Sequence, residues 1–448
     1  MTSPAPLTEG NLVRALLSLS VPYAVGSGLN LASMLGDRFW IGALGDGGLA
    51  GFGTAHAVWM LAMTLVLGLA GGTLANVAHA VGRGDRRHAS RTLGQGLLLA
   101  LGLGVLGLVL LAPLATALLG WVAPDAATGA AAGSYLQVCL GGLVVQAPLL
   151  TIVFALQGAG EARTAFWVGA VAPLANLVLD PVLIVGSGLA LPGAAWATVG
   201  AHALALAIGL RVLRRRWGLT LGDLRPEPTA LRQILWVGGP KTLEHWVRNL
   251  AGLALVAILA QRGGAVIAGH TAALALLLVL IFPGLALGQA TAALVGQNLG
   301  ADRPDRAWRV MWLSAGLYAG ILGLVALISY RLAPSLVGLF VDDGASLEAG
   351  VTLWRAWAPS LPFLGVGLVV GKALGGARKP LPALGSAVLA YVVIQLPLVA
   401  LLASRSGVAG AGAGMAAAFV AQGALCALAG AFFLRPPRAS VRLARSMA

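Results

Sequence analysis

The stretch LVRALLSLSVPYAVGSGLNLASMLGDRFW, residues 12–40, joins a long apolar run to a deeply placed acid, Asp37. The run exceeds the roughly 20 residues that a helix needs to cross a hydrocarbon core about 30 Å thick. An ionised side chain near the bilayer centre costs at least about 2.5 to 3.5 kcal/mol on insertion scales, so such acids usually line an ion or substrate pathway. The stretch therefore predicts a membrane helix that carries a functional acid.

Apolar stretches of this length recur along nearly the whole chain. The sequence is 58% hydrophobic and only 10% charged, whereas soluble domains hold about 25% charged residues. We therefore expect an all-α integral membrane protein. The expected spans are twelve, at residues 12–40, 49–77, 92–119, 130–158, 164–187, 191–213, 231–261, 266–296, 310–332, 349–374, 380–403 and 408–434.

The basic residues indicate how the chain crosses the membrane. They gather after every second span, whereas the intervening loops carry few of them and include Asp46, Asp125, Asp342 and Asp343. Because basic loops stay in the cytoplasm, we expect a multi-pass protein of the cell (inner) membrane with both termini cytoplasmic. The formal net charge of +14 then belongs to loops near membrane lipid, and no nucleic-acid site is expected. The basic residues after those spans include Arg83, Arg86, Arg87, Arg211, Arg214, Arg215, Arg216, Arg303, Arg306 and Arg309.

The chain contains an internal repeat. Pro22 aligns with Pro240, and further along the alignment slips so that Arg163 pairs with Arg378. Because each copy has an even number of helices, both copies start on the same side of the membrane. This predicts two six-helix bundles related by a pseudo-two-fold axis along the membrane normal. We expect an N-terminal lobe at 1–213, a cytoplasmic linker at 214–230, and a C-terminal lobe with a short cytoplasmic tail at 231–448.

The acids break the repeat. Asp37 aligns with Leu255, and Asp180, which lies in the 164–187 span, falls opposite Gln395 or its neighbours. Neither acid has an acidic counterpart in the second half. Because the scaffold is duplicated and the charge is not, we expect the chemistry in the N-terminal lobe.

Polar side chains accompany Asp37 at helical spacing. Asn30 and Ser33 precede it by seven and four residues, so the three lie on one face of the first helix. Pro22 lies two turns before Asn30 and removes a backbone hydrogen bond, which allows a bend.

A matching set surrounds Asp180. Asn176 precedes it by one turn, and Tyr135 and Thr198 lie early in the fourth and sixth spans. If these polar faces meet, their oxygens could bind a small hard cation, or the two carboxyls could share a proton. The alternative is that each acid is salt-bridged inside the bundle.

A second polar stripe lies on the 231–261 span. Its four side chains carry both signs of charge on one helix face. We favour a self-neutralising ladder of ion pairs at the cytoplasmic end or the lobe interface over a lining for the C-lobe half of a cavity. The stripe consists of Lys241, Glu244, His245 and Arg248.

Motifs of enzyme chemistry are absent from the sequence. The GxGxxG pattern at Gly102, Gly104 and Gly107 lies inside an apolar span with no preceding strand, so it indicates close helix packing. The sequence has no Walker motif, zinc-spaced His/Cys set or GxSxG elbow. We therefore expect no enzyme activity and no cofactor.

Three segments resemble those of the multidrug and toxic compound extrusion (MATE) family, and the resemblance covers essentially all twelve spans. They are DRFWIGALG at 37–45, NLVLDP at 176–181 and VGQNLGADRPDRA at 295–307. NLVLDP is similar to the fifth-helix motif of a prokaryotic branch whose ion site lies in the N-terminal lobe. Another branch uses C-lobe acids, one of them on the tenth helix; here residues 349–374 contain no acid, although Glu244 keeps part of that arrangement.

The resemblance implies a secondary active multidrug efflux antiporter. It would export small organic, cationic amphipathic molecules in exchange for protons or Na⁺, by rocking of two lobes, and we expect a monomer. The alternatives are a lipid or lipid-linked saccharide flippase of the same superfamily and an integral-membrane enzyme. By the resemblance, the cation or proton site would comprise Asp37, Asn176, Asp180 and Thr198, with Tyr135 as a neighbour and Pro22 as the point where the first helix bends. We expect Asn30 and Ser33 to line the substrate cavity.

Overall fold

A computed structural model describes residues 7–120 and 126–436. Every regular element within these residues is a helix, so the expected all-α class is confirmed. Asp125, which the sequence places in a loop with few basic residues, and the C-terminal residues 437–448 lie outside the described residues.

The described residues provide twelve apolar crossings. Ten helices are long and apolar enough to cross a membrane, and the pair Gly129–Gly141 and Leu143–Gly158, bent by 49°, makes an eleventh. One of the ten, Leu381–Phe433, contains two of the expected spans. These are separated at Ser406 and Gly407, whose backbone angles are not helical. The predicted number of spans is therefore confirmed.

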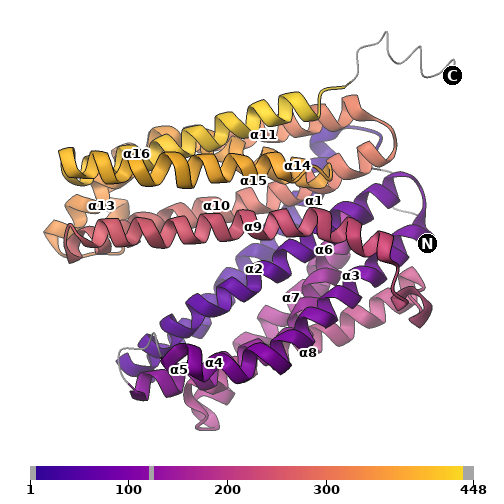
Figure 1. Cartoon of the computed structure of the whole chain (residues 1–448), viewed down its shortest axis with the longest axis horizontal. Coiled ribbons are helices and arrows are strands. Elements are labelled where there is room, and N and C mark those ends of the chain that lie inside the picture. Colours follow the sequence, from indigo (N-terminus) through magenta and orange to yellow (C-terminus); the bar gives the residue numbers. More distant parts are fainter. Residues whose placement is uncertain (1–6, 121–125, 437–448) are drawn as a thin grey trace. The chain divides into compact units, whose positions relative to one another are not determined.

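The helices form two compact units (Figure 1). Unit 1 comprises residues 17–242 among the described residues, and unit 2 comprises residues 7–16 and 243–436. Two helices are divided between the units: α1 (Leu12–Gly42) and α9 (Pro228–Ala260). The remaining helices of unit 1 are α2 (Asp46–Gly82), α3 (Arg86–Leu106), η1 (Gly107–Leu111), α4 (Ala112–Gly120), α5 (Ala126–Gly141), α6 (Leu143–Gly158), α7 (Ala162–Asp180), η2 (Pro181–Gly186), α8 (Ala190–Trp217) and η3 (Leu221–Leu224). Those of unit 2 are α10 (Gly264–Gly300), α11 (Pro304–Arg331), α12 (Ala333–Val337), α13 (Gly344–Trp357), η4 (Ala358–Ser360), α14 (Leu361–Gly376), α15 (Leu381–Ala387), η5 (Val388–Gln395) and α16 (Leu396–Phe433).

The backbone repeats in the two units. Helices α2 and α10 both have 37 residues. A Cβ atom on Gly158 would lie 2.5 Å from the carbonyl oxygen of Leu74, and one on Gly376 would lie 2.2 Å from that of Ala292. The alignment that pairs Pro22 with Pro240 also pairs Gly158 with Gly376 and Leu74 with Ala292. The same helix crossing therefore occurs in both halves, and each copy needs a glycine at this position.

Left-handed residues after the helices correct the expected alignment. Gly160 and Arg378 both have positive φ, and they are separated in the sequence by the same number of residues as Pro22 and Pro240. Arg378 therefore pairs with Gly160 rather than with Arg163. The next such pair, Gly188 and Gly407, has almost the same offset. Asp180 therefore falls opposite Leu398 or Val399, slightly beyond Gln395, and still has no acidic counterpart.

One side chain of unit 1 makes three hydrogen bonds to the backbone of the linker. Gln95 of α3 donates from Nε2 to the carbonyl oxygens of Asp223 (3.0 Å) and Arg225 (2.8 Å), and its Oε1 accepts the backbone N–H of Glu227 (2.9 Å). The segment before α1 is held in unit 2, where Arg303 Nη2 contacts Glu9 Oε1 at 3.0 Å. The segment that precedes the first helix of each half is thus fixed by polar contacts.

Candidate ion site

Helices α1 and α7 approach each other closely at the predicted site. A Cβ on Gly36 of α1 would lie 2.7 Å from Leu177 Cδ2 of α7, and one on Gly26 would lie 3.6 Å from Phe166 Cδ2. The small residues let the two helices meet along the face that carries Ser33. The polar stripe of the first helix therefore faces the polar stripe of the fifth span.

Three of the predicted residues form a hydrogen-bonded chain across this contact. Ser33 Oγ donates to Asn176 Oδ1 at 2.6 Å, and Asn176 Nδ2 donates to Asp180 Oδ1 at 2.9 Å. Ser33 and Asn176 are buried, and Asp180 is 0% exposed. The chain thus connects the first helix to the acid of α7 through direct side-chain hydrogen bonds.

Asp37 completes a pair of carboxyls. Its side chain lies beside those of Asp180 and Asn176 and is partly buried. Within residues 7–120 and 126–436, Asp37 Oδ1 and Asp180 Oδ2 are buried and accept no hydrogen bond, and neither acid takes part in an ion pair. The internal salt bridges that were the alternative for these acids are therefore not seen in the described part of the chain.

The backbone changes form at Asp180. The α-helix α7 ends at this residue, and the π-helix η2 begins at Pro181. Proline has no N–H to donate to the carbonyl four residues earlier, so one bond of the α-helical hydrogen-bond ladder is missing at Pro181. Such π-helical insertions are often found at functional sites, because they leave backbone groups outside the regular pattern.

Tyr135 lies in the same neighbourhood with two partners that the sequence had not indicated. It is buried on α5, its phenol lies beside the thiol of Cys139 one turn later, and its ring contacts that of Phe52 at a centroid distance of 5.6 Å. Its phenol is within electrostatic range of Asp37 and Asp180. The i, i+4 spacing of Tyr135 and Cys139 was the signal that could have revealed the first partner.

Other predicted residues have local contacts instead. Thr198 Oγ1 donates to the carbonyl oxygen of Ala194 at 3.0 Å, and Asn30 Nδ2 donates to that of Gly26 at 2.9 Å. Thr198 is partly buried and Asn30 is exposed. Pro22 lies inside α1, which is one helix from Leu12 to Gly42.

The polar stripe of α9 contains an ion pair. Arg248 Nη2 lies 2.9 Å from Glu244 Oε1, and the guanidinium lies 5.4 Å from the centroid of the Tyr391 ring. Lys241 packs against α2, where a Cβ on Gly71 would lie 3.2 Å from its Cδ. The structure thus shows one of the ion pairs expected along this stripe, between Glu244 and Arg248. The function of the stripe stays a prediction.

Comparison with known proteins gives matches along most of the chain. A profile of the MatE family matches residues 22–182 and 240–401, one segment in each half. The FAD transporter of Shewanella oneidensis is 27% identical over 423 residues, which cover 90% of this chain and 91% of that protein. The probable multidrug resistance protein NorM of Deinococcus radiodurans is 28% identical over 424 residues, which cover 92% and 93%.

Solved structures share the fold. The crystal structure of MATE in complex with MaL6 aligns with a TM-score of 0.91 at 23% identity, over 97% of this chain and 99% of the other. A transporter of the MOP superfamily from Pyrococcus furiosus aligns with a TM-score of 0.90 at 22% identity, over 97% and 99%. The fold expected from the sequence is therefore found among solved membrane transporters.

Proposed function

Because this chain belongs to the MatE family, whose members are transporters and not enzymes, we propose that it is a secondary active antiporter. It exports organic, cationic amphipathic compounds in exchange for protons or sodium ions. The name of the Deinococcus relative, a probable multidrug resistance protein, supports the export of foreign compounds. The proposal includes both termini in the cytoplasm, lobes at 1–213 and 231–448 joined by a linker at 214–230, and a monomer.

The observation that carries the proposal is the pair of carboxyls at Asp37 and Asp180. Two ionised carboxylates about 4 Å apart repel by about 4 kcal/mol at an effective dielectric constant of about 20. No cationic side chain of the described residues pairs with either acid. A proton or a metal cation is thus the partner that makes the pair tolerable, and it can be exchanged in a transport cycle.

The two candidate ions make different demands on Asn176. In the structure its amide NH₂ donates to Asp180 Oδ1, an arrangement that suits a carboxyl pair sharing a proton. A sodium ion would need oxygen ligands, so the amide would have to turn over and present Oδ1, which now accepts from Ser33 Oγ. Ion occupancy would therefore change the hydrogen bonds that connect α1 to α7.

This connection offers a route for coupling. Ser33 belongs to α1, and Asn176 and Asp180 belong to α7. When the ion binds, the chain of hydrogen bonds between the helices is rearranged, and Pro22 makes α1 easier to bend because one backbone bond is missing. Substrate and ion then compete through the position of α1, which couples inward ion flow to outward export.

Efflux from proteoliposomes tests the proposal. Ethidium-loaded vesicles are given a proton gradient in one experiment and a sodium gradient in another, with protein-free vesicles as the control. We expect one gradient to drive ethidium across the membrane. The FAD transporter among the relatives defines the competing substrate class. Gradient-driven movement of FAD without ethidium would contradict cationic substrates, and no driven movement of either compound would contradict antiport.

A further inference from the structure

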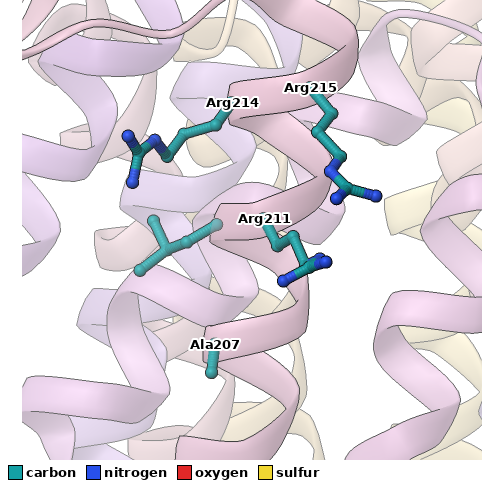
Figure 2. Close-up of a pocket in the computed structure, with 5 residues that line it drawn as sticks. Ala207, Arg211, Arg214 and Arg215 are labelled. Atoms are coloured by element: carbon teal, nitrogen blue, oxygen red, sulfur yellow. The ribbon is translucent and has the colours of Figure 1, made fainter.

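The end of α8 that leads into the linker carries a group of arginines with no part in the proposed ion site. Arg211, Arg214 and Arg215, with Ala207 and Leu210, line a hollow of about 450 Å³. Figure 2 shows Arg214 reaching to one side of the helix, Arg211 and Arg215 to the other, and Ala207 one turn away. These three arginines, Arg211, Arg214 and Arg215, lie on one face of α8 and are called the arginine fork below.

These three charges are uncompensated, unlike that of their neighbour Arg216. Arg216 Nη1 donates to Thr164 Oγ1 at 3.1 Å and lies 4.0 Å from Glu161 Oε2. No carboxylate of residues 7–120 or 126–436 forms an ion pair with Arg211, Arg214 or Arg215. The fork is therefore available for an anion from outside the chain.

The acids near the fork already have other partners. Glu161 Oε1 accepts the indole N–H of Trp217 at 3.1 Å, and Asp223 Oδ2 accepts from the backbone and side chain of Thr220 at 2.9 and 2.8 Å. Both carboxylates are thus used to fix the turn after α8.

The fork is more than the basic flank that marks a cytoplasmic loop. The positions of the other half that correspond to residues 211–215 are 429–434; they contain no basic residue, and Arg435 follows directly. The repeated scaffold therefore does not require three arginines here. Arg214 and Arg215 lie in the last turn of α8, where a cation favours the helix dipole, but Arg211 lies a turn earlier. Its charge needs another explanation.

An apolar strip continues from the fork along α8. Leu204 and Ile208 are 52% and 37% exposed, and they lie at i, i+4 on the face that leads to Arg211 and Arg215. Helix α8 is long and apolar enough to span a membrane. A ligand with a phosphate between the arginines would thus have apolar surface for attached chains directly beside it.

We propose that this hollow binds the headgroup phosphate of an anionic phospholipid, with the acyl chains along Leu204 and Ile208. Basic pockets at the cytoplasmic ends of membrane helices recognise such headgroups, because each cation near the surface strengthens binding to anionic lipid. The arginine fork supplies the charge, and the strip supplies the apolar contact. The lipid holds the linker end of α8 at the level of the headgroups.

Native mass spectrometry of the purified, delipidated full-length protein tests this site. Phosphatidylglycerol and phosphatidylcholine are titrated separately against the wild type, a variant with Arg211→Gln, Arg214→Gln and Arg215→Gln, and a matched variant with three exposed arginines replaced elsewhere. That control carries Arg83→Gln, Arg86→Gln and Arg87→Gln. We expect the first variant to bind phosphatidylglycerol about 100-fold more weakly than the wild type, from about a fivefold loss per arginine. The control should bind as the wild type does, and phosphatidylcholine should not distinguish the three proteins.

Two further arms separate the possible outcomes. Replacement of the three arginines by lysine keeps the charge and should restore most of the binding, which a folding defect of the glutamine variant would not explain. Glycerol 3-phosphate, which has the phosphate without acyl chains, should not displace the lipid. Equal loss in the control variant, unchanged binding in the fork variant, or displacement by glycerol 3-phosphate would each overturn the proposal.

Discussion

Asparagine in place of Asp180 should abolish coupled export and leave the fold intact. Asp180 Oδ1 accepts a bond of 2.9 Å from Asn176 Nδ2, and the amide oxygen of asparagine can accept the same bond. The substitution therefore removes mainly the charge, including that on Oδ2, which accepts no hydrogen bond from the described residues. Removal of a buried charge that no cationic side chain pairs with should be neutral or stabilising, by at most roughly the 2.5 to 3.5 kcal/mol that insertion scales give for an acid at the bilayer centre. The midpoint of thermal unfolding in detergent should thus stay or rise.

Ethidium efflux from proteoliposomes measures the functional effect of this substitution. Asp180→Asn should reduce ion-driven efflux to the level of protein-free vesicles, and Asp37→Asn should do the same. The double variant should be no worse than either single variant, because the two carboxyls would hold one ion and act as a unit. Efflux at the wild-type rate in either single variant would refute this reasoning.

Asn176→Leu is the matched contrast, because it removes hydrogen bonds and no charge. It leaves Ser33 Oγ and Asp180 Oδ1 without their partner. Buried side-chain hydrogen bonds in membrane proteins contribute about 0.6 kcal/mol on average and about 1.7 at most, so two of them predict a loss of about 1 to 3 kcal/mol. We expect lower stability and partial export, the reverse of the pattern for Asp180→Asn.

Three other predictions concern topology, the second stripe and packing. A reporter fused after Arg216 should indicate the cytoplasm and one at Asp342 the outside; opposite signals would overturn the orientation. Glu244→Gln should reduce efflux less than either N-lobe asparagine variant, and complete loss of efflux in a folded protein would move the coupling to the C-lobe. Gly193→Ala places a Cβ 2.0 Å from the carbonyl oxygen of Leu183 and should lower stability by about 1 to 3 kcal/mol in thermal unfolding, whereas Gly200→Ala, with its nearest atom at 3.7 Å, should not.

The spans and the fold class could be predicted because the hydrocarbon core of the membrane fixes the length and polarity of each spanning helix. Each crossing needs about 20 apolar residues, and this chain supplies them without long soluble insertions. The alignment of the two halves was harder, because the left-handed positions that mark it are not all glycine. Arg378 adopts such a conformation at the place where Gly160 does so in the first half. A comparison by residue type therefore paired Arg378 with the wrong arginine.

The polar contacts of the site could be predicted only in part. Helical spacing put Ser33 and Asn176 on polar faces, and the structure shows that these faces meet. Spacing could not show that the hydroxyl of Thr198 donates to the carbonyl oxygen of Ala194 in its own helix. Such a local hydrogen bond competes with any contact to another helix. Nor could it show that Phe52, from a different helix, packs against Tyr135. Contacts between helices depend on rotation and depth, which one sequence does not specify.

Release of the coupling ion on substrate binding tests the central claim most directly. The purified wild-type protein in weakly buffered detergent is mixed with ethidium, and proton release is followed with a pH indicator and sodium release with radioactive sodium. The account predicts that the wild type releases one of these ions, and that the Asp37→Asn, Asp180→Asn double variant releases neither while remaining folded. Equal ion release by the double variant would contradict the claim that these two carboxyls hold the coupling ion.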